Sequence, residues 1–195
     1  AVFIKSSGEY SQCPQNDLPE YAFIGRSNVG KSSLINMLTN RHKLALVSST
    51  PGKTMLINHF LINNNWHLVD LPGYGYVKSS KNKREEFIPM TMNYILNRKQ
   101  LVLLFALIDS RLEPQTIDIN FINTLGENQI PFAIVFTKTD KLSKTALNRQ
   151  LENYKNTLSE MWEELPPIFT TSTETGFGRQ EILDYIETLN KNYTG

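Results

Sequence analysis

The stretch Gly25–Ser32, which reads GRSNVGKS, decides the fold. It matches the pattern GxxxxGK followed by Ser or Thr. It lies between an apolar run at Tyr21–Ile24, which predicts a strand, and an amphipathic segment at Lys31–Thr39, which predicts a helix. Glycines in such a loop let backbone N–H groups point at a polyphosphate, and the helix N-terminus adds its dipole. A chance glycine turn would require neither flanking element, so the stretch predicts a phosphate-binding loop.

Most residues of this loop are expected to contact the phosphates. They are Gly25, Arg26, Ser27, Asn28, Val29, Gly30, Lys31, Ser32 and Ser33. Lys31 brings a mobile positive charge to the β- and γ-phosphates, so it also counts among the expected catalytic residues. The Ser32 hydroxyl is expected to ligate Mg²⁺.

Outward from this loop, short apolar runs alternate with amphipathic segments. Strands are expected at Tyr21–Ile24, Leu56–Ile62, Trp66–Val69, Leu101–Ile108, Phe132–Phe136 and Ile168–Thr170. Helices are expected at Lys31–Thr39, Lys83–Arg98, Gln115–Asn128, Ser143–Trp162 and Gln180–Lys191. Only Asn63–Asn65 separates two of the strands, which is hairpin spacing. We therefore predict a three-layer α/β/α fold with a mixed, mostly parallel six-stranded sheet and one antiparallel edge strand.

Length and composition set further limits. At roughly 150 residues per domain, residues 1–195 form a single domain, in which residues 1–18 either add a strand at a sheet edge or pack as a loop. Twenty Lys and Arg against nineteen Asp and Glu exclude nucleic-acid binding by bulk charge, but not by a local patch. The single Cys13 excludes a disulfide framework within the chain. The longest apolar run, Leu101–Ile108, is far shorter than the ~20 residues of a membrane span, so a cytoplasmic protein is expected.

Two further segments are expected at the phosphates. Asp70 follows the strand Trp66–Val69, where a carboxylate holds Mg²⁺ through water, and the N–H of Gly73 can reach a γ-phosphate. In TPGKT, residues 50–54, we expect phosphate contacts from Gly52, Lys53 and Thr54, with the Thr54 hydroxyl on Mg²⁺. Read alone, an Asp-capped turn and an ordinary loop explain these two segments.

The base is expected after the next strands. Asp140 follows Phe132–Phe136, and its carboxylate can accept two hydrogen bonds from guanine, which adenine does not offer. The stem of Lys138 can cover the purine face, and Thr137 precedes it. A helix N-cap is the alternative for Asp140. Thr171, Ser172 and Thr173 give a weaker signal for contacts to the guanine oxygen. Together these elements predict a guanine-nucleotide-binding domain.

These motifs resemble those of the EngB (YihA/YsxC) family of translation-factor-class P-loop GTPases. The similarity covers essentially the whole chain and is close at GRSNVGKSSLIN (Gly25–Asn36), TPGKT (Thr50–Thr54), DLPGYGY (Asp70–Tyr76) and TKTDKL (Thr137–Leu142). The resemblance implies a Ras-like fold and Mg²⁺-dependent binding of GTP and GDP. It also implies a role in assembly of the large ribosomal subunit, with contacts to rRNA or ribosomal proteins, and a requirement for normal cell division and septation. A monomer is expected.

Catalysis is expected to be slow. Many GTPases place Gln directly after the DxxG glycine to orient water, and this chain has Tyr74 there. Lys31, Thr54, Gly73 and Asn28 are the expected catalytic residues. Asn28 occupies the position where K⁺-activated relatives carry asparagine, so K⁺ is an open second cofactor; a hydrogen bond to the loop backbone is the alternative.

Other features leave alternatives open. Lys78, Lys81, Lys83 and Arg84 form either a solvated helix start or an RNA-facing patch. A nucleotide kinase would need an arginine-bearing lid that the sequence does not offer. A ribosome-binding module with negligible turnover stays the alternative function, because Tyr74 replaces the glutamine.

Two minor patterns also carry predictions. His59 and His67 lie on one face of the predicted hairpin, and we expect them to face solvent, because a zinc site needs more ligands. A helical stripe predicts core packing by Leu147, Leu151, Tyr154, Leu158, Met161 and Trp162.

Overall fold

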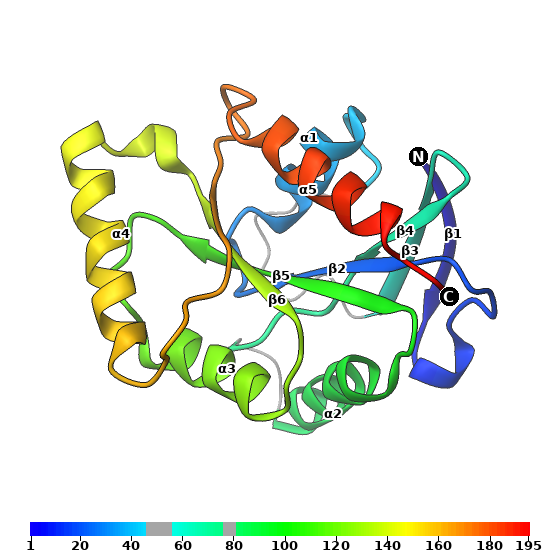
Figure 1. Cartoon of the computed structure of the whole chain (residues 1–195). Helices are drawn as coiled ribbons and strands as arrows, with labels where there is room; N and C mark the ends of the chain where they lie inside the picture. The colour runs from blue at the N-terminus through cyan, green and yellow to red at the C-terminus, as the bar shows by residue number, and fades with distance from the viewer. Residues whose placement is uncertain (46–55, 76–80) are drawn as a thin grey trace.

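The computed structural model describes residues 1–45, 56–75 and 81–195, with the backbone alone for residues 81–88 (Figure 1). Within these residues the sheet has seven strands, in the order β1-β3-β4-β2-β5-β6-β7. They are β1 (Val2–Ser7), β2 (Glu20–Gly25), β3 (Ile57–Ile62), β4 (Trp66–Asp70), β5 (Leu101–Asp109), β6 (Phe132–Thr137) and β7 (Ile168–Thr170). The helices are α1 (Lys31–Thr39), α2 (Lys81–Asn97), α3 (Thr116–Glu127), α4 (Lys144–Ser159) and α5 (Arg179–Lys191).

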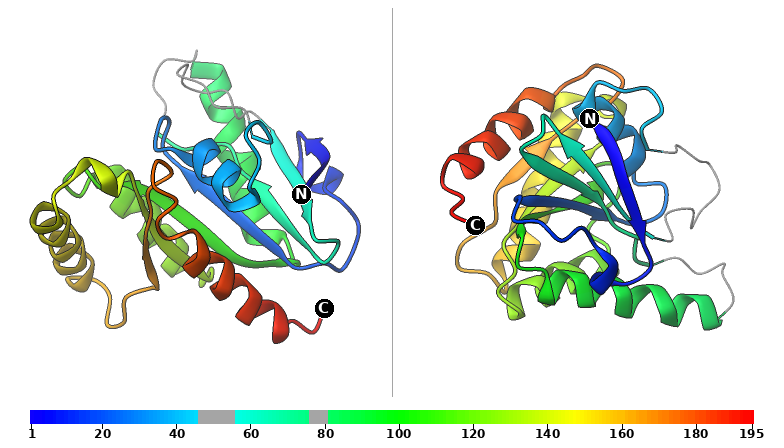
Figure 2. Two further views of the ribbon diagram at one scale, coloured as in Figure 1. Left: turned by 90° about the horizontal axis from the view of Figure 1, so that it is seen from above. Right: turned by 90° about the vertical axis from the view of Figure 1, so that its right-hand side faces the viewer.

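Helices cover both faces of the sheet (Figures 1 and 2). On one face, Leu34 of α1 and Ile186 of α5 join a buried apolar cluster. On the other face, Tyr94 of α2, Ile122 of α3 and Leu158 of α4 join a second cluster. Because both faces are covered, the central strands β2, β4 and β6 are buried at every position rather than at alternate ones. The three-layer α/β/α arrangement is therefore confirmed.

The N-terminal segment forms the strand that the sequence left open. β1 pairs antiparallel with β3, from Val2 opposite Leu61 to Ser7 opposite Ile57. The described sheet thus has seven strands rather than the predicted six. β3 is the antiparallel strand, but it is not at the edge, because β1 covers its outer side. At an edge β1 does not need the buried run that identifies the central strands, and residues 2–6 are exposed.

The hairpin between β3 and β4 is confirmed. Asn63 and Asn64 both adopt left-handed backbone conformations, with φ of 47° and 56°. Asparagine tolerates that conformation better than other non-glycine residues, and a tight turn between antiparallel strands requires it. The register places His59 opposite Val69 and Leu61 opposite His67, so both histidines lie on one face as predicted.

The two histidines are nevertheless buried, and the expectation that they face solvent is wrong. The reason is Glu20, a fully buried carboxylate at the start of β2. His59 Nε2 lies 3.2 Å from Glu20 Oε1, and His67 Nδ1 lies 3.9 Å from it. The hairpin face that carries the histidines therefore turns inward onto Glu20, because a buried charge needs polar neighbours.

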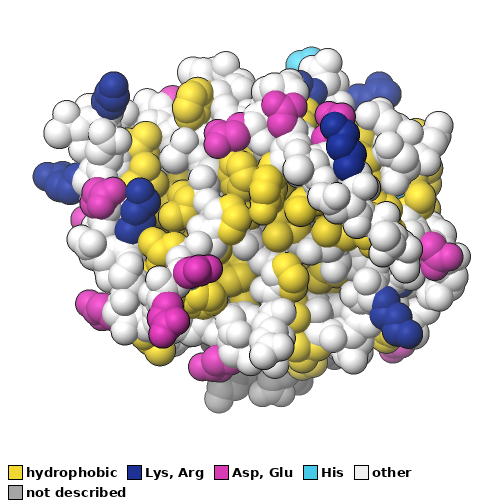
Figure 3. Space-filling view, viewed as in Figure 1, with side chains coloured by type: hydrophobic (Ala, Val, Ile, Leu, Met, Phe, Trp, Pro, Cys, Tyr) yellow, Lys and Arg dark blue, Asp and Glu magenta, His cyan; other side chains and the backbone are white. Residues whose placement is uncertain are grey.

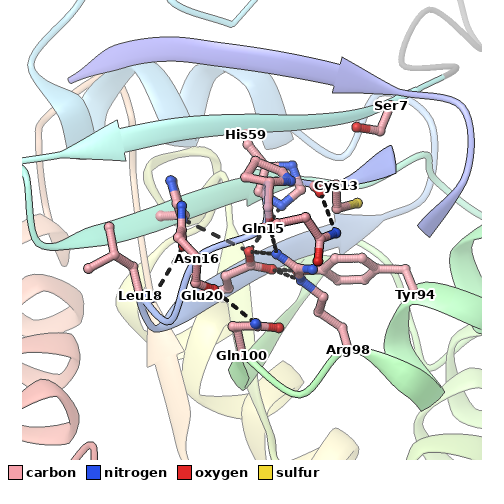
Figure 4. Close-up of polar contacts among 12 residues, drawn as sticks. Ser7, Cys13, Gln15, Asn16, Leu18, Glu20, His59, Tyr94, Arg98 and Gln100 are labelled. Carbon is pink, nitrogen blue, oxygen red and sulfur yellow. Dashed lines mark hydrogen bonds and ion pairs between the residues drawn. The ribbon is translucent and has the colours of Figure 1, made fainter. Parts of the chain in front are cut away.

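Two residues of the α2 region complete this group, which we call the Glu20 cluster: Glu20, His59, His67, Tyr94 and Arg98. Figure 4 labels all of these except His67. Arg98 donates from Nε and Nη2 to the two carboxylate oxygens, at 3.0 and 2.6 Å, and the Tyr94 hydroxyl donates at 2.6 Å. Arg98 Nη2 also donates to the backbone oxygen of Pro14, at 2.6 Å. The cluster therefore joins the N-terminal segment, the start of β2 and the end of α2.

The opposite edge of the sheet is short and flanked by charge. β7 has three residues and pairs with β6. Figure 3 shows this side of the molecule, with apolar side chains near its centre and charged ones around them. Of the predicted core stripe, Tyr154 and Leu158 are buried, and Leu151 and Trp162 pack against the same cluster while partly buried. Met161, beyond the helix, is 70% exposed. A three-residue edge strand offers little backbone for pairing with another sheet.

Candidate nucleotide-binding site

The predicted site residues gather at the carboxyl ends of the parallel strands. The phosphate loop follows β2, Asp70 ends β4, the TKTD segment follows β6, and Thr171–Thr173 follows β7. β2 pairs in parallel with β4 and β5, and β6 pairs in parallel with β5 and β7. Because parallel strands end at the same edge, loops far apart in sequence meet there.

Two glycines give the phosphate loop its shape. Gly30 has φ of 101° and precedes the first turn of α1, where a side chain would strain the backbone. A Cβ on Gly25 would lie 2.8 Å from Val29 Cγ1 and 3.1 Å from the Leu107 oxygen. Asn28 also has a left-handed backbone, with φ of 63°. These conformations suit a loop whose N–H groups converge on an anion.

Lys31 and Asp70 form a buried ion pair across the phosphate loop and the end of β4. Lys31 is 9% exposed and Asp70 is 4% exposed. Ser32 follows Lys31 in the first turn of α1. Mg²⁺ prefers oxygen ligands, so the Ser32 hydroxyl and the Asp70 carboxylate fit this ion. For Lys31 to meet a phosphate, its ammonium has to exchange part of its interaction with Asp70 for the ligand.

The base-recognition segment is tied to the phosphate loop by side chains. Thr137 Oγ1 donates to the backbone oxygen of Val29, at 2.6 Å, and Lys138 Nζ donates to that of Asn28, at 2.7 Å. Lys138 Nζ also lies 3.0 Å from Asp109 Oδ2. Side-chain hydrogen bonds therefore join the phosphate loop to the TKTD segment.

Asp140 lies where the base is expected. It is exposed, and Ser172 Oγ donates to its Oδ1 at 2.7 Å. This hydrogen bond, helped by Lys141, lowers the pKa of the Asp140 carboxyl below its usual range, so the group is ionised at neutral pH. Thr139 donates from both N and Oγ1 to the backbone oxygen of Thr171, at 3.2 and 3.0 Å. Thr137, Lys138, Asp140, Thr171 and Ser172 are thus brought together, and Thr173 follows as an exposed residue.

The DLPG turn lies against the phosphate loop. Gly73 is exposed, and a Cβ on it would overlap the carbonyl oxygen of Gly25. The next side chain, Tyr74, points to α3: its hydroxyl donates to Asp118 Oδ1 at 2.9 Å, and its ring stacks on Phe121. The Tyr74 side chain therefore packs against α3. Its hydroxyl is engaged with Asp118 rather than directed at the phosphates.

Some predicted residues lie outside the described part of the chain. These are Gly52, Lys53 and Thr54 of the TPGKT segment, and Lys78 of the basic patch. Lys81, Lys83 and Arg84 lie in the backbone-only part of α2. Their assigned roles stay predictions.

The structure adds acidic and basic residues that the motifs did not identify. Asp109 ends β5 at the same edge of the sheet and is bound by Arg111, whose Nη2 lies 2.8 Å from Asp109 Oδ2. Asp118 of α3, with Arg26 and Lys138, lines a hollow beside the phosphate loop. The position of Asp109 at a strand end was a usable signal in the sequence. Asp118 lies inside an amphipathic helix and offered none.

Comparison with known proteins agrees with this geometry. The family model described as a 50S ribosome-binding GTPase matches residues 20–138. The curated probable GTP-binding protein EngB of Phocaeicola vulgatus is 58% identical over 98% of this chain and 96% of its own length. That of Bacteroides fragilis is 59% identical over 98% and 95%.

The chain belongs to the EngB family of GTP-binding proteins.

Solved structures show the same fold as this EngB-family chain. A crystal structure of a probable GTP-binding protein EngB aligns with a TM-score of 0.68 and 24% identity, over 89% of this chain and 99% of that one. Aquifex aeolicus Era bound to GDP and aluminium fluoride aligns with a TM-score of 0.71 and 21% identity, over 92% and 58%. At these identities the likeness supports the P-loop GTPase fold alone. Among the described residues, no helix has the length and apolarity to cross a membrane.

Proposed function

We propose that the protein is a Mg²⁺-dependent GTP switch that hydrolyses GTP slowly and acts on the assembling large ribosomal subunit. By family resemblance we extend this to a requirement for normal cell division and septation. The observation that supports guanine-nucleotide binding is that hydrogen bonds join the predicted base-binding segment to the phosphate loop. Lys138 and Thr137 hold the base segment to the phosphate loop at 2.7 and 2.6 Å, and the ionised Asp140 faces outward. Such an arrangement suits a ligand with a guanine at one end and phosphates at the other.

The roles of the residues follow from their positions. Backbone N–H groups of residues 25–33 and the Lys31 ammonium bind the phosphates, while Asp140 accepts hydrogen bonds from guanine. Ser32 and Thr54 would ligate Mg²⁺ and Asp70 would hold it through water; when bound, the ion neutralises charge that develops on the phosphates. Gly73 would donate its N–H to the γ-phosphate. Asp70 is freed for the ion when Lys31 turns to the phosphates.

Two features bear on the rate. Tyr74 occupies the position of the water-orienting glutamine, and its hydroxyl is already bound to Asp118. We therefore expect intrinsic hydrolysis well below 1 s⁻¹. Asn28 is exposed at the mouth of the phosphate loop, so its side-chain oxygen is available to hold K⁺ against the phosphates.

Turnover in different salts tests the nucleotide part. GTP hydrolysis should need Mg²⁺ and run faster in K⁺ than in Na⁺, and Asn28→Ala should remove that difference. Equal rates in the two salts would remove the K⁺ role and leave GTP binding intact. If GTP is not hydrolysed even with ribosomal particles present, the alternative is favoured, a nucleotide-regulated ribosome-binding module. The hydrogen bond that engages the Tyr74 hydroxyl with Asp118 also supports this alternative.

Co-sedimentation with ribosomal subunits tests the partner. We expect binding to the large subunit with a non-hydrolysable GTP analogue, weaker binding with GDP, and loss of binding as salt rises. Lys81→Glu with Lys83→Glu should weaken it and leave GTP affinity nearly unchanged. The matched control is Lys144→Glu with Arg149→Glu, two exposed charges of α4. Equal binding in both nucleotides, or an unaffected double variant, would place the contact elsewhere. We further propose that the protein is a monomer, which sedimentation velocity would test. We also propose that it is cytoplasmic.

A further inference from the structure

The segment after the DLPG turn contacts α3 at successive residues. The Tyr74 ring lies 4.3 Å from that of Phe121, at an interplanar angle of 23°. The Tyr74 hydroxyl donates to Asp118 Oδ1 at 2.9 Å, and Asp118 is 3% exposed. Gly75 has φ of 76°, and a Cβ there would lie 2.6 Å from Ile117 Cδ1. The segment therefore contacts α3 in three ways: by ring stacking, by a hydroxyl hydrogen bond and by close packing at a glycine.

The other side of the same turn contacts the phosphate loop. Gly73 packs against the Gly25 carbonyl, and Tyr74 forms a parallel β-bridge with Arg26. The turn is therefore held between the phosphate loop and α3. Gly73, whose N–H can bind a γ-phosphate, lies next to the side chain that α3 holds.

Asp118 is more than a packing residue in this arrangement. Its burial raises the pKa of the carboxyl, while the Tyr74 hydrogen bond and the charge of Arg26 oppose that change. A buried carboxyl is costly compared with an apolar side chain of similar size, unless polar partners compensate. A directional hydrogen bond fixes the tyrosine in one position, which apolar packing alone would not do.

We propose that Asp118 and Phe121 of α3 are positioning residues for the DLPG turn, which hold Tyr74 so that Gly73 stays beside the phosphate loop. The inference rests on the proposed function, because it concerns how the chain meets a γ-phosphate. It assigns Tyr74 a structural connection to α3 in place of a role in orienting water. α3 thereby becomes part of what distinguishes GTP from GDP.

Nucleotide affinities of single variants test this. Tyr74→Phe keeps the ring and removes the hydroxyl. Affinity for a non-hydrolysable GTP analogue should fall about fivefold, while GDP affinity should change less than about twofold, because GDP places no phosphate at Gly73. Asp118→Ala should act in the same direction. Asp118→Asn keeps an oxygen that accepts from Tyr74, so it should retain most of the analogue affinity. Glu127→Gln, exposed at the end of the same helix, is the matched control and should change neither affinity.

The ratio of the two affinities separates positioning from general stability. Phe121→Ala should lower the ratio of analogue affinity to GDP affinity, as Tyr74→Phe should. Equal losses for both nucleotides, or an unchanged ratio, in Tyr74→Phe would overturn the positioning role and leave the proposed function standing. Should Asp118→Ala not fold, Tyr74→Phe decides the question. Failure of the unmodified chain to bind guanine nucleotides would overturn the proposed function itself.

Discussion

The sheet treats charge differently at its two ends: at the amino end of β2, where Glu20 lies, and at the carboxyl ends of the parallel strands, where the phosphate loop follows β2 and Asp140 follows β6. At the amino end, the Glu20 carboxylate is fully buried and receives three hydrogen bonds from Tyr94 and Arg98. At the carboxyl end, Asp140 is exposed and carries hydrogen-bonding capacity that the protein uses only in part. The Glu20 carboxylate is thus satisfied inside the protein, whereas the Asp140 carboxylate keeps part of its hydrogen-bonding capacity for a ligand. We expect substitutions at the first to change stability and substitutions at the second to change binding.

The largest effect is expected at the amino end. Glu20→Gln should lower the free energy of unfolding by about 3–5 kcal/mol, because it leaves the buried Arg98 without its counter-charge. Urea denaturation measures this, with the exposed Asp17→Asn as control. While Glu20→Gln is folded, its GTP affinity should stay within about twofold of wild type, because the Glu20–Arg98 ion pair is distant from the binding loops. A large loss of affinity in a folded Glu20→Gln protein would break the comparison, because the two ends would then be coupled.

A smaller effect, on binding alone, is expected at the carboxyl end. Asp140→Asn should weaken GTP by about ten- to a hundredfold, the equivalent of roughly 1.5–3 kcal/mol for hydrogen bonds to a charged group. It should also gain affinity for xanthine nucleotides, whose carbonyl suits an amide donor. Calorimetry with GTP, XTP and ATP measures both. ATP binding as strong as GTP binding in the wild type would contradict the guanine assignment.

The two ends differ in how visible they are in the sequence. The phosphate loop and the Asp140 segment are continuous motifs, because consecutive backbone and side-chain groups of one loop meet one ligand. The Glu20 cluster draws its members from β2, β3, β4 and the α2 region, and its residues have no fixed spacing. His59 and His67 were placed on one face by strand register alone, but only Glu20 beneath them decides that this face is buried. Asp118 likewise belongs to no motif, because its partner Tyr74 lies 44 residues away in the sequence.

Acid should destabilise the amino end of the sheet, because His67 and Glu20 of the Glu20 cluster titrate there. Burial lowers the pKa of His67, so the folded protein resists a proton that the unfolded chain accepts near pH 6.5. Stability should be full above pH 6.5 and fall below it. Glu20 adds a second loss: burial raises its pKa, but His59 and Arg98 outweigh that and lower it to about 2. Its contribution is present above pH 4.5 and disappears between there and pH 2.

Denaturation midpoints measured from pH 8 to pH 4 check this dependence. His67→Gln should flatten the curve between pH 6.5 and 5, because it removes the titrating imidazole. Stability that does not change between pH 8 and 5 in the wild type would contradict the assignment of a neutral, buried His67.

The smallest effect sharpens the description of the base subsite. Ser172→Ala removes the hydroxyl that donates to Asp140 at 2.7 Å. GTP affinity should fall about two- to tenfold, in line with roughly 0.5–1.5 kcal/mol for one hydrogen bond. Exposed Thr173→Ala, one residue along, is the comparison. A larger effect at Thr173 than at Ser172 would show that the guanine contacts lie further along this loop.

The sequence distance across the Glu20 cluster has a consequence for synthesis. Glu20 and Arg98 are 78 residues apart. At translation rates of roughly 5–20 residues per second, Glu20 leaves the peptidyl-transferase centre about 4–16 s before its partner. Throughout that interval the nascent chain carries β2 with a carboxylate whose Arg98 partner has not yet been synthesised. We therefore expect the Glu20 end of the sheet to close only after α2 and Arg98 have been translated.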